Sequence, residues 1–306
     1  MFLDGVGLGE ANPTFNPLAA ARTPTMDWLF RGRLTVDLEP FAGSRRLFRH
    51  LDPCLGCAGL PQSATGQAAL LTGHNAAREM NGHYGPYPGP TIRRLLAAGT
   101  LFSDVLAADG SACLANAFPP SYLRSVAESG RRMNAFVCAA RMAGLDLFGL
   151  ESYRAGTAVS ADLDGAYLFE LDPANPRLKP AQAGRRLARI ASKCDLTFFD
   201  FWLSDAAGHR WSLADATALI EKLDGFLAGL LPALGDVTLL ITSDHGNVED
   251  KRVRTHTSNA VPLLACGPAA PAFADASSLL DVAPAVRRAL RVPAGELDPD
   301  LTPSLP

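Results

Sequence analysis

Apolar runs that stop abruptly at polar residues dominate the pattern of this chain. Residues 237–241 are apolar except for Thr238, and the run stops shortly before Asp244. A second strongly apolar run, residues 196–203, stops just before Asp205. Runs of this length are typical of strands that are buried on both faces of a sheet, and a functional site often follows the carboxyl end of such a strand. Both runs are therefore predicted to be core strands that lead into a site.

Helical patterns alternate with these runs. Shorter strands are predicted at residues 1–3, 34–38 and 112–118, and a helix is predicted to begin near Pro61 and Ser63 and to stop at Gly73. Further helices are predicted over residues 20–30, 91–98, 101–108, 187–192 and 213–231. The alternation predicts an α/β fold, a three-layer sandwich in which helices cover both faces of a largely parallel central sheet.

The middle of the chain has a weaker pattern. From residue 119 to residue 180 the segments are short and turn residues are frequent, so we interpret this stretch as a small inserted cap. Residues 1–118 and 181–306 then form one catalytic α/β core. The 306-residue chain is 48% hydrophobic and 19% charged, which is enough for a sizeable core.

The first strand is unusually short. Three apolar residues lead straight into Asp4, which is shorter than strands inside sheets usually are. Either the strand is clipped, or the true start codon lies upstream of Met1, and we keep the second as a hypothesis. Asp4 is followed by Gly5, Gly7 and Gly9, which indicates a loop whose backbone comes close to another group. The alternative is a simple Asp-Gly turn.

Charge and cysteine content narrow the function classes. The net charge of −3 argues against a nucleic-acid or acidic-membrane partner, and no apolar run reaches transmembrane length. The first residues do not resemble a secretion signal, so we expect a cytoplasmic protein of unspecified oligomeric state. Six Cys are present, and Cys54 and Cys57 form a C-x-x-C pair without a second pair. We expect reduced thiols rather than a zinc or redox site.

Three of the six His residues lie in short polar motifs beside predicted strands, and two of them have an Asp nearby. The members of this set are Asp205, His209, Asp244, His245 and His256. One Asp-His pair alone could equally be a capped turn with a solvated His. Gathered with Asp4 at one edge of a sheet, the set would offer oxygen and nitrogen ligands for two divalent ions, Mn²⁺ or Zn²⁺.

Ser63 is the candidate nucleophile. It lies at the predicted start of a helix, where the positive end of the helix stabilises a phosphate or an alkoxide. The alternative is that Ser63 is only the N-cap residue, which is a common role for Ser at that place. Thr65 is the reserve candidate for the nucleophile.

The order of these residues resembles the alkaline phosphatase superfamily of metalloenzymes. Residues 242–250 and 255–262 are most similar to the cofactor-independent phosphoglycerate mutases, and residues 4–10 also resemble phosphopentomutases. The resemblance covers roughly the first 80 and the last 120 residues, and its motifs are specific in combination and in this order. It implies an alkaline-phosphatase-like fold and two divalent metal ions.

The resemblance also implies roles for single residues. It assigns Asp205, His209 and His256 to one ion. It assigns Asp4, Asp244 and His245 to the other ion, with Ser63 as a bridging ligand and nucleophile. The implied reaction is attack of the Ser63 alkoxide on a small phosphorylated substrate, which gives a phosphoserine. Water or a second substrate hydroxyl then takes the phosphoryl group.

This sequence departs from the mutases at several points. Gln67 stands where they usually have a His, and the large cap, the Gly-Gly-Val-His segment and the arginine set that hold phosphoglycerate have no counterpart. Because a mutase must shield its intermediate from water, the small cap favours a phosphohydrolase. The alternatives are a phosphomutase and a non-catalytic metal-binding relative; a sulfatase is disfavoured because no Cys-x-Pro-x-Arg segment is present.

Four polar residues beside the motifs are candidates for substrate contacts, because amide and guanidinium groups can hold a phosphate oxygen. They are Asn12, Asn75, Arg78 and Asn259. Trp202 lies inside the 196–203 run, and we expect its side chain in the core.

Overall fold

A mixed sheet lies at the centre of the computed structural model, which describes residues 1–129 and 132–294. Its strand order is β2-β3-β10-β9-β1-β8. These strands are β1 (Phe2–Leu3), β2 (Phe41–Ala42), β3 (Arg46–Leu51), β8 (Asp200–Phe201), β9 (Leu239–Thr242) and β10 (Val261–Cys266). Two further strand pairs are β4 (Ala112–Leu114) with β7 (Leu196–Phe198) and β5 (Asn116–Ala117) with β6 (Val159–Ser160).

The direction of β10 makes the sheet mixed rather than largely parallel. β1 runs parallel to both β8 and β9, whereas β10 runs antiparallel to β9 and β3. No crossover helix separates β9 from β10; a loop joins them, so the chain returns in the opposite direction. The predicted α/β class is confirmed, and the site-bearing strands β1 and β9 are parallel neighbours.

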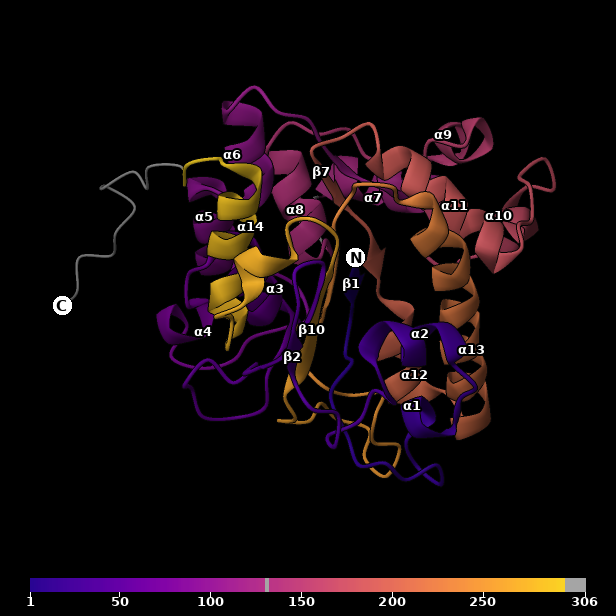
Figure 1. Ribbon diagram of the computed structural model, residues 1–306. Helices are drawn as coiled ribbons and strands as arrows, with labels where there is room; N and C mark the ends of the chain where they lie inside the picture. Colours follow the sequence, from indigo (N-terminus) through magenta and orange to yellow (C-terminus); the bar gives the residue numbers. More distant parts are fainter. Residues whose placement is uncertain (130–131, 295–306) are drawn as a thin grey trace.

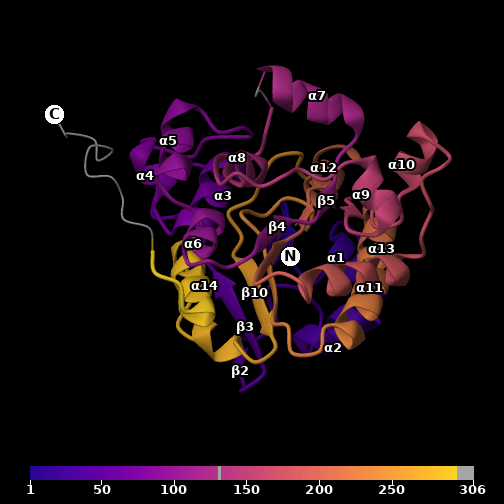
Figure 2. The ribbon, with the colours of Figure 1, turned by 90° about the horizontal axis from the view of Figure 1, so that it is seen from above.

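Helices cover both faces of this sheet (Figures 1 and 2). One layer contains α3 (Ser63–Thr72), α5 (Pro90–Ala98), α6 (Leu101–Ala107), α8 (Ala135–Met142) and α14 (Val282–Leu290), and the other contains α2 (Pro24–Phe30), α11 (Pro180–Ala191) and α13 (Leu213–Leu230). The other described helices are α1 (Pro17–Ala20), α4 (Ala76–Glu79), α7 (Pro120–Ser129), α9 (Leu150–Ala155), α10 (Ala166–Leu171) and α12 (Leu203–Arg210). Three 3₁₀ segments complete the described elements: η1 (Leu231–Ala233), η2 (Ala270–Phe273) and η3 (Leu279–Asp281).

The core is built on the alternation of side chains along β1. Phe2 contributes to the cluster under α3, α8 and α14, and Leu3 contributes to the cluster under α11 and α13. The pair α11 and α13 packs especially closely, because a Cβ at Gly229 would lie 1.9 Å from the carbonyl oxygen of Ala181. Both helical layers are thus held directly against the strand that carries Asp4.

Two predicted elements differ from the structure near the N-terminus. The helix predicted at 20–30 is two helices, because the chain breaks after Ala20 and restarts at Pro24, a residue suited to the first turn of a helix. The strand predicted at 34–38 is wrong: it is a turn whose Leu34 and Leu38 are buried. The two buried leucines of this loop have the spacing of side chains on one face of a strand, which produced the wrong prediction. Strands β2 and β3 were not predicted.

The apolar run 196–203 is not one strand. It divides into β7 and β8, and α12 begins at Leu203. Trp202 precedes that helix and is 46% exposed, so the expectation that it lies in the core is wrong. Residues 112–118 likewise divide into β4 and β5. The chain changes partner strand within each run, so an apolar run marks burial but not the continuity of a strand.

Among its described residues, the predicted cap contains α7, α8, α9, α10 and β6, and α8 packs in a core layer. Figure 2 shows α7 projecting from the body of the molecule. The division into core and cap stays a prediction, and residues 295–306 of the predicted core lie outside the described residues. Within the described ranges, every helix is too short or too polar to cross a membrane.

Candidate metal centre

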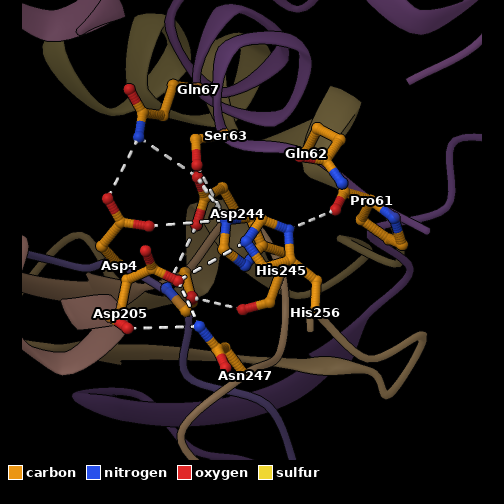
Figure 3. Close-up of polar contacts among 12 residues, drawn as sticks. Asp4, Pro61, Gln62, Ser63, Gln67, Asp205, Asp244, His245, Asn247 and His256 are labelled. Atoms are coloured by element: carbon orange, nitrogen blue, oxygen red, sulfur yellow. Dashed lines mark hydrogen bonds and ion pairs between the residues drawn. The ribbon is translucent and has the colours of Figure 1, made fainter. Parts of the chain in front are cut away.

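Segments that are far apart in the sequence bring their carboxylates and imidazoles together at the carboxyl ends of β1 and β9 (Figure 3). Asp4 follows β1, and Asp244 with His245 follows β9. The donor atoms form two groups, in each of which they lie within 4.8 Å of one another. One group is Asp4, Asp244 and His245; the other is Asp205, His245 and His256.

The first group is buried, with Asp244 and His245 completely so. The Nε2 atom of His245 lies 3.5 Å from a carboxylate oxygen of Asp4 and 3.5 Å from one of Asp244. Burial, together with the charges of neighbouring carboxylates, raises the pKa of Asp4 and of Asp244 well above the usual range. The Oδ1 atom of Asp4 is buried and accepts no hydrogen bond from the described residues. A divalent cation fits this donor set, because it would offset the repulsion and occupy the unused oxygen.

His256 of the second group and the neighbouring His209, which belongs to neither group, are held by hydrogen bonds at their outer ring nitrogens. His256 contacts the carbonyl oxygen of Pro61 through Nδ1 at 2.7 Å, and His209 contacts that of Arg254 through Nδ1 at 2.9 Å. Each contact turns the Nε2 atom inward, and the two Nε2 atoms lie 3.2 Å apart. Orientation of this kind is typical of imidazoles that ligate metals.

Asp205 lies between these two imidazoles. One carboxylate oxygen is 3.4 Å from Nε2 of His209 and the other is 3.6 Å from Nε2 of His256. Burial alone would raise the pKa of Asp205, but the hydrogen bonds with His209 and Asn247 outweigh it and lower the pKa to about 2. Asp205 is therefore an anionic oxygen donor at neutral pH.

His245 connects the two groups. Its ring stacks on that of His256 with a centroid separation of 3.7 Å, and burial lowers its pKa to about 3. Burial also lowers the pKa of His256. Both rings are neutral at physiological pH, which is the form that binds a metal ion.

Ser63 is the first residue of α3, after the N-cap residue Gln62. Its Oγ atom lies 3.0 Å from Nε2 of His245, and its side chain is buried. Thr65, the reserve candidate, is also buried, but its hydroxyl donates to the carbonyl oxygen of Gln62 at 3.0 Å. Ser63 is thus the hydroxyl that the fold directs at the donor groups.

Glu249 was not predicted, although it lies at the centre of the hydrogen bonds behind the site. It is completely buried and accepts from the backbone N–H groups of Gly7 at 3.0 Å and Asn247 at 2.7 Å. It also accepts from the Thr257 hydroxyl and from the Asn259 amide. A Cβ at Gly7 would lie 2.3 Å from its carboxylate, so this carboxylate is the group that the glycine-rich loop approaches.

Gln67, Asn247 and Asp200 are further polar residues at the site that were given no role from the sequence. Gln67 donates to Asp4 at 3.4 Å and to Asp244 at 3.2 Å. Asn247 donates to the Asp205 carboxylate at 2.6 Å. Asp200 accepts from Asn134 at 2.6 Å, and burial raises its pKa to about 7. The signal for Asn247 was its place two residues after His245, that for Gln67 was its place where the mutases usually have a His, and that for Asp200 was its place inside the apolar run 196–203.

The four candidate substrate residues are dispersed. Asn12 accepts hydrogen bonds from Thr14, and Asn75 caps α4 and donates to the carbonyl oxygen of Leu55. Arg78 is exposed on α4. Asn259 contacts Glu249, behind the donor groups. Among the described residues, none of these side chains hydrogen-bonds a candidate metal ligand.

Known proteins share both sequence and fold with this chain. The family model described as "Metalloenzyme superfamily" matches residues 1–294. A 2,3-bisphosphoglycerate-independent phosphoglycerate mutase of Rhodopseudomonas palustris is 34% identical over 124 residues, which are 37% of this chain and 24% of that protein. The corresponding mutase of Methylobacillus flagellatus is 32% identical over 109 residues, 32% of this chain and 21% of that protein. The matches thus span about a quarter or less of these mutases.

Two solved structures resemble the whole chain. A cold-active alkaline phosphatase from Shewanella sp. has a TM-score of 0.58 and 14% identity, and the match covers 94% of this chain and 98% of that one. The alkaline phosphatase from the Antarctic bacterium TAB5 has a TM-score of 0.53 and 12% identity, with coverage of 95% and 97%. At such identities the likeness establishes the fold alone, and it confirms the predicted alkaline-phosphatase-like architecture.

Proposed function

The chain belongs to the metalloenzyme superfamily, and from this premise we propose that it is a metal-dependent phosphoryl-transfer enzyme with Ser63 as its nucleophile. One observation carries the proposal. The Ser63 hydroxyl lies at the N-terminus of α3 and 3.0 Å from His245, the residue that both donor groups share. A hydroxyl in this place is next to the ligands of an activating cation and faces the positive end of a helix.

The donor sets indicate how cations would be held. Asp4, Asp244 and His245 would bind one ion, with Ser63 beside it, and Asp205, His209 and His256 would bind the other. When bound, such ions would neutralise charge on the phosphoryl oxygens and favour ionisation of a nearby hydroxyl. Mn²⁺ and Zn²⁺ both suit carboxylate and imidazole donors.

The reaction then follows from the position of Ser63. The Ser63 hydroxyl gives up its proton, its oxygen forms a bond to phosphorus as the ester bond of the substrate breaks, and the leaving alkoxide takes up a proton to become a free alcohol. The product on the protein is phosphoserine. In a hydrolase, water attacks this phosphorus, the serine oxygen leaves and regains a proton, and inorganic phosphate is released. The N-terminal N–H groups of α3 stabilise negative charge throughout.

We favour hydrolysis over transfer to a second hydroxyl because the inserted segment is small. A mutase must hold its intermediate away from water while it turns over, and residues 119–180 provide only short helices for this purpose. The mutase is the second candidate, and the sequence identity with phosphoglycerate mutases supports it.

A phosphate-release screen tests the proposal. Protein loaded with Mn²⁺ or with Zn²⁺ is incubated with a chromogenic phosphomonoester and with a panel of phosphorylated metabolites. We expect release of phosphate and a trapped phosphoserine at Ser63, and we expect Ser63→Ala to lower kcat by on the order of 10³-fold or more. Thr65→Val is the matched control, and it should still form the phosphoserine.

The other outcomes separate the alternatives. Migration of phosphate within a sugar phosphate, without net release, identifies a mutase. Metal binding with no phosphoserine on any substrate identifies a non-catalytic relative. A phosphothreonine at Thr65 would show that Thr65, and not Ser63, is the nucleophile.

A further inference from the structure

The C-x-x-C pair lies in the loop between β3 and α3, the helix that begins at Ser63. Both thiols are free, and both side chains are partly exposed. The N–H of Cys57 donates to the carbonyl oxygen of Cys54 at 2.9 Å, so these two residues are the ends of a tight turn. The ends of such a turn lie within about 7 Å, and a disulfide spans Cα atoms about 4.4–6.8 Å apart. The backbone therefore holds the two cysteines at a separation that a disulfide can span.

The turn has a conformation that is unfavourable for one of its residues. The central residues Leu55 and Gly56 have φ angles of 56° and 66°. Glycine adopts a positive φ readily, whereas leucine is strained there because of its Cβ atom. Burial of the Leu55 side chain holds this conformation, as does a hydrogen bond of 2.8 Å from the Asn75 amide to the Leu55 carbonyl oxygen. The fold thus maintains a strained backbone between the two cysteines, which is typical of functional sites.

An unpaired imidazole lies beside this turn. Both ring nitrogens of His83 are buried and form no hydrogen bond with a described residue. The ring lies near backbone groups of Cys54 and Cys57, and burial lowers the pKa of His83, so the imidazole is neutral. Thiols react as thiolates, and a neutral imidazole can accept a thiol proton. Burial and the charge of Asp52 raise the pKa of the Cys54 thiol, so we assign the first attack to Cys57.

We propose that Cys54 and Cys57 are a redox-active dithiol, which a small external disulfide such as oxidised glutathione converts reversibly into an intramolecular disulfide. The Cys57 sulfur bonds to one sulfur of the external disulfide, and the other sulfur leaves as a thiolate. The Cys54 sulfur then displaces the second small thiolate, which closes the ring. The two cysteines are oxidised, and the external disulfide is reduced to two thiols that take up the two protons. The free thiols of this structure are the reduced state of the pair.

The dithiol lies beside the second donor group, so its oxidation changes the support of a candidate metal ligand. The Cys54 thiol donates to the carbonyl oxygen of Ser258 at 4.0 Å, two residues after His256. Four residues after Cys57, the carbonyl oxygen of Pro61 contacts Nδ1 of His256 at 2.7 Å (Figure 3). The disulfide removes the S–H donor and tightens the loop that leads to Pro61. Partners that orient ligands change metal affinity by about 10–100-fold, so the oxidised protein should bind Mn²⁺ about tenfold more weakly. This consequence rests on the donor groups of the proposed function.

Incubation of the metal-free protein with oxidised glutathione tests the dithiol. Peptide mass spectrometry should find a disulfide between residues 54 and 57, with the loss of two hydrogen atoms, and dithiothreitol should reverse it. Cys54→Ser should retain glutathione on Cys57, whereas Cys57→Ser should react far more slowly. Cys266→Ser is the matched control, because Cys266 is also partly exposed, and it should still form the disulfide. Calorimetric titration with Mn²⁺ should show the tenfold loss of affinity on oxidation, and Cys57→Ser should not show it.

Several results would overturn the proposal. One is the absence of the disulfide in excess oxidised glutathione; another is a disulfide between Cys113 and Cys194, whose side chains are neighbours, in its place. Equal Mn²⁺ affinities of the reduced and oxidised proteins would show that the turn does not support His256. Disulfide formation is measured without substrate or metal, so it does not depend on phosphoryl transfer. A protein that releases no phosphate but forms the disulfide reversibly would refute the proposed function and leave the dithiol intact.

Discussion

Replacing Glu249 with Gln tests whether one buried carboxylate holds the candidate metal centre together. Glu249 accepts four hydrogen bonds, two of them from backbone N–H groups that cannot reverse their polarity. These come from Gly7 in the loop after β1 and from Asn247 in the loop after β9. The other two come from Thr257 and Asn259, beside His256. The carboxylate thus ties together three of the segments that carry candidate ligands.

The expected loss of unfolding free energy in Glu249→Gln follows from these four hydrogen bonds. A Gln of the same shape would keep its oxygen toward the two N–H groups, and its NH₂ group would then face Thr257 and Asn259. A hydroxyl can rotate and an amide can flip, so those two contacts can be recovered. The lost part is the charge assistance of the two backbone bonds. A bond to a charged group contributes about 1.5–3 kcal/mol and a neutral one about 0.5–1.5 kcal/mol, so Glu249→Gln should cost about 2–3 kcal/mol.

Substitution of Glu249 should lower the metal affinity of the site as well as the stability of the fold. Partners that orient ligands typically change metal affinity by about 10–100-fold when they are lost. We expect Glu249→Gln to weaken Mn²⁺ binding by about tenfold, and Glu249→Ala to weaken it further, because it leaves both N–H groups buried and unpaired. Urea unfolding and calorimetric titration with Mn²⁺ measure the two effects.

Glu10→Gln is the matched control. Glu10 is exposed and pairs with Arg252, so the same chemical change there should cost less than about 0.5 kcal/mol and should leave metal affinity unchanged. A Glu249→Gln protein that unfolds like the Glu10→Gln control and binds Mn²⁺ normally would show that the carboxylate does not hold the site.

Metal removal and helix packing give two more tests. Because burial and neighbouring charges raise the pKa of Asp4 and Asp244 in the folded chain, their contribution to stability is present below the usual Asp range and is lost as the pH rises. The lowered pKa values of His245 and His256 act in the opposite direction, because their contribution to stability is lost as the pH falls. Comparison with Asp4→Asn isolates the carboxyl part: between pH 5.5 and pH 8 the Tm of the chelated protein should fall relative to that of chelated Asp4→Asn, and a Tm difference that does not change with pH contradicts the reasoning. In α13, Gly229→Ala should cost about 1–3 kcal/mol in urea unfolding, because its Cβ would lie 1.9 Å from the carbonyl oxygen of Ala181. Gly225→Ala on the same helix meets only ordinary contact distances and should be neutral or stabilising, so equal losses at both positions would refute the packing argument.

The arrangement of the candidate ligands could be predicted from the sequence, because several of them directly follow predicted strands. Asp4 and Asp244 each follow a short apolar run, and parallel neighbouring strands bring their carboxyl ends to one edge. His245 is adjacent to Asp244, so its place follows from the same strand. The division of His residues between two ions rested instead on the resemblance, and the described geometry gives His245 a donor position in both groups.

Other features could not be predicted from the sequence, because an apolar pattern indicates that a segment is buried but not where its strand ends or which way each side chain points. Trp202 belongs to an apolar run, yet the run ends its strand one residue earlier and the indole ring is exposed. Leu34 and Leu38 anchor a loop with the spacing of a strand. Cys54 and Cys57 are free thiols.

The glycine-rich loop shows why the partners of ligands are harder to predict than the ligands. The alternate glycines after Asp4 indicate that the backbone approaches something, but the pattern does not say what. The structure identifies the group as Glu249, more than 200 positions away: a Cβ at Gly7, Gly9 or Gly246 would lie within 3 Å of its side chain. Glu249 itself is an ordinary acidic residue in a polar loop. The glycine loop and Glu249 come into contact only because the strands β1 and β9 are neighbours in the sheet. This part of the site therefore depends on the fold and not on any local motif.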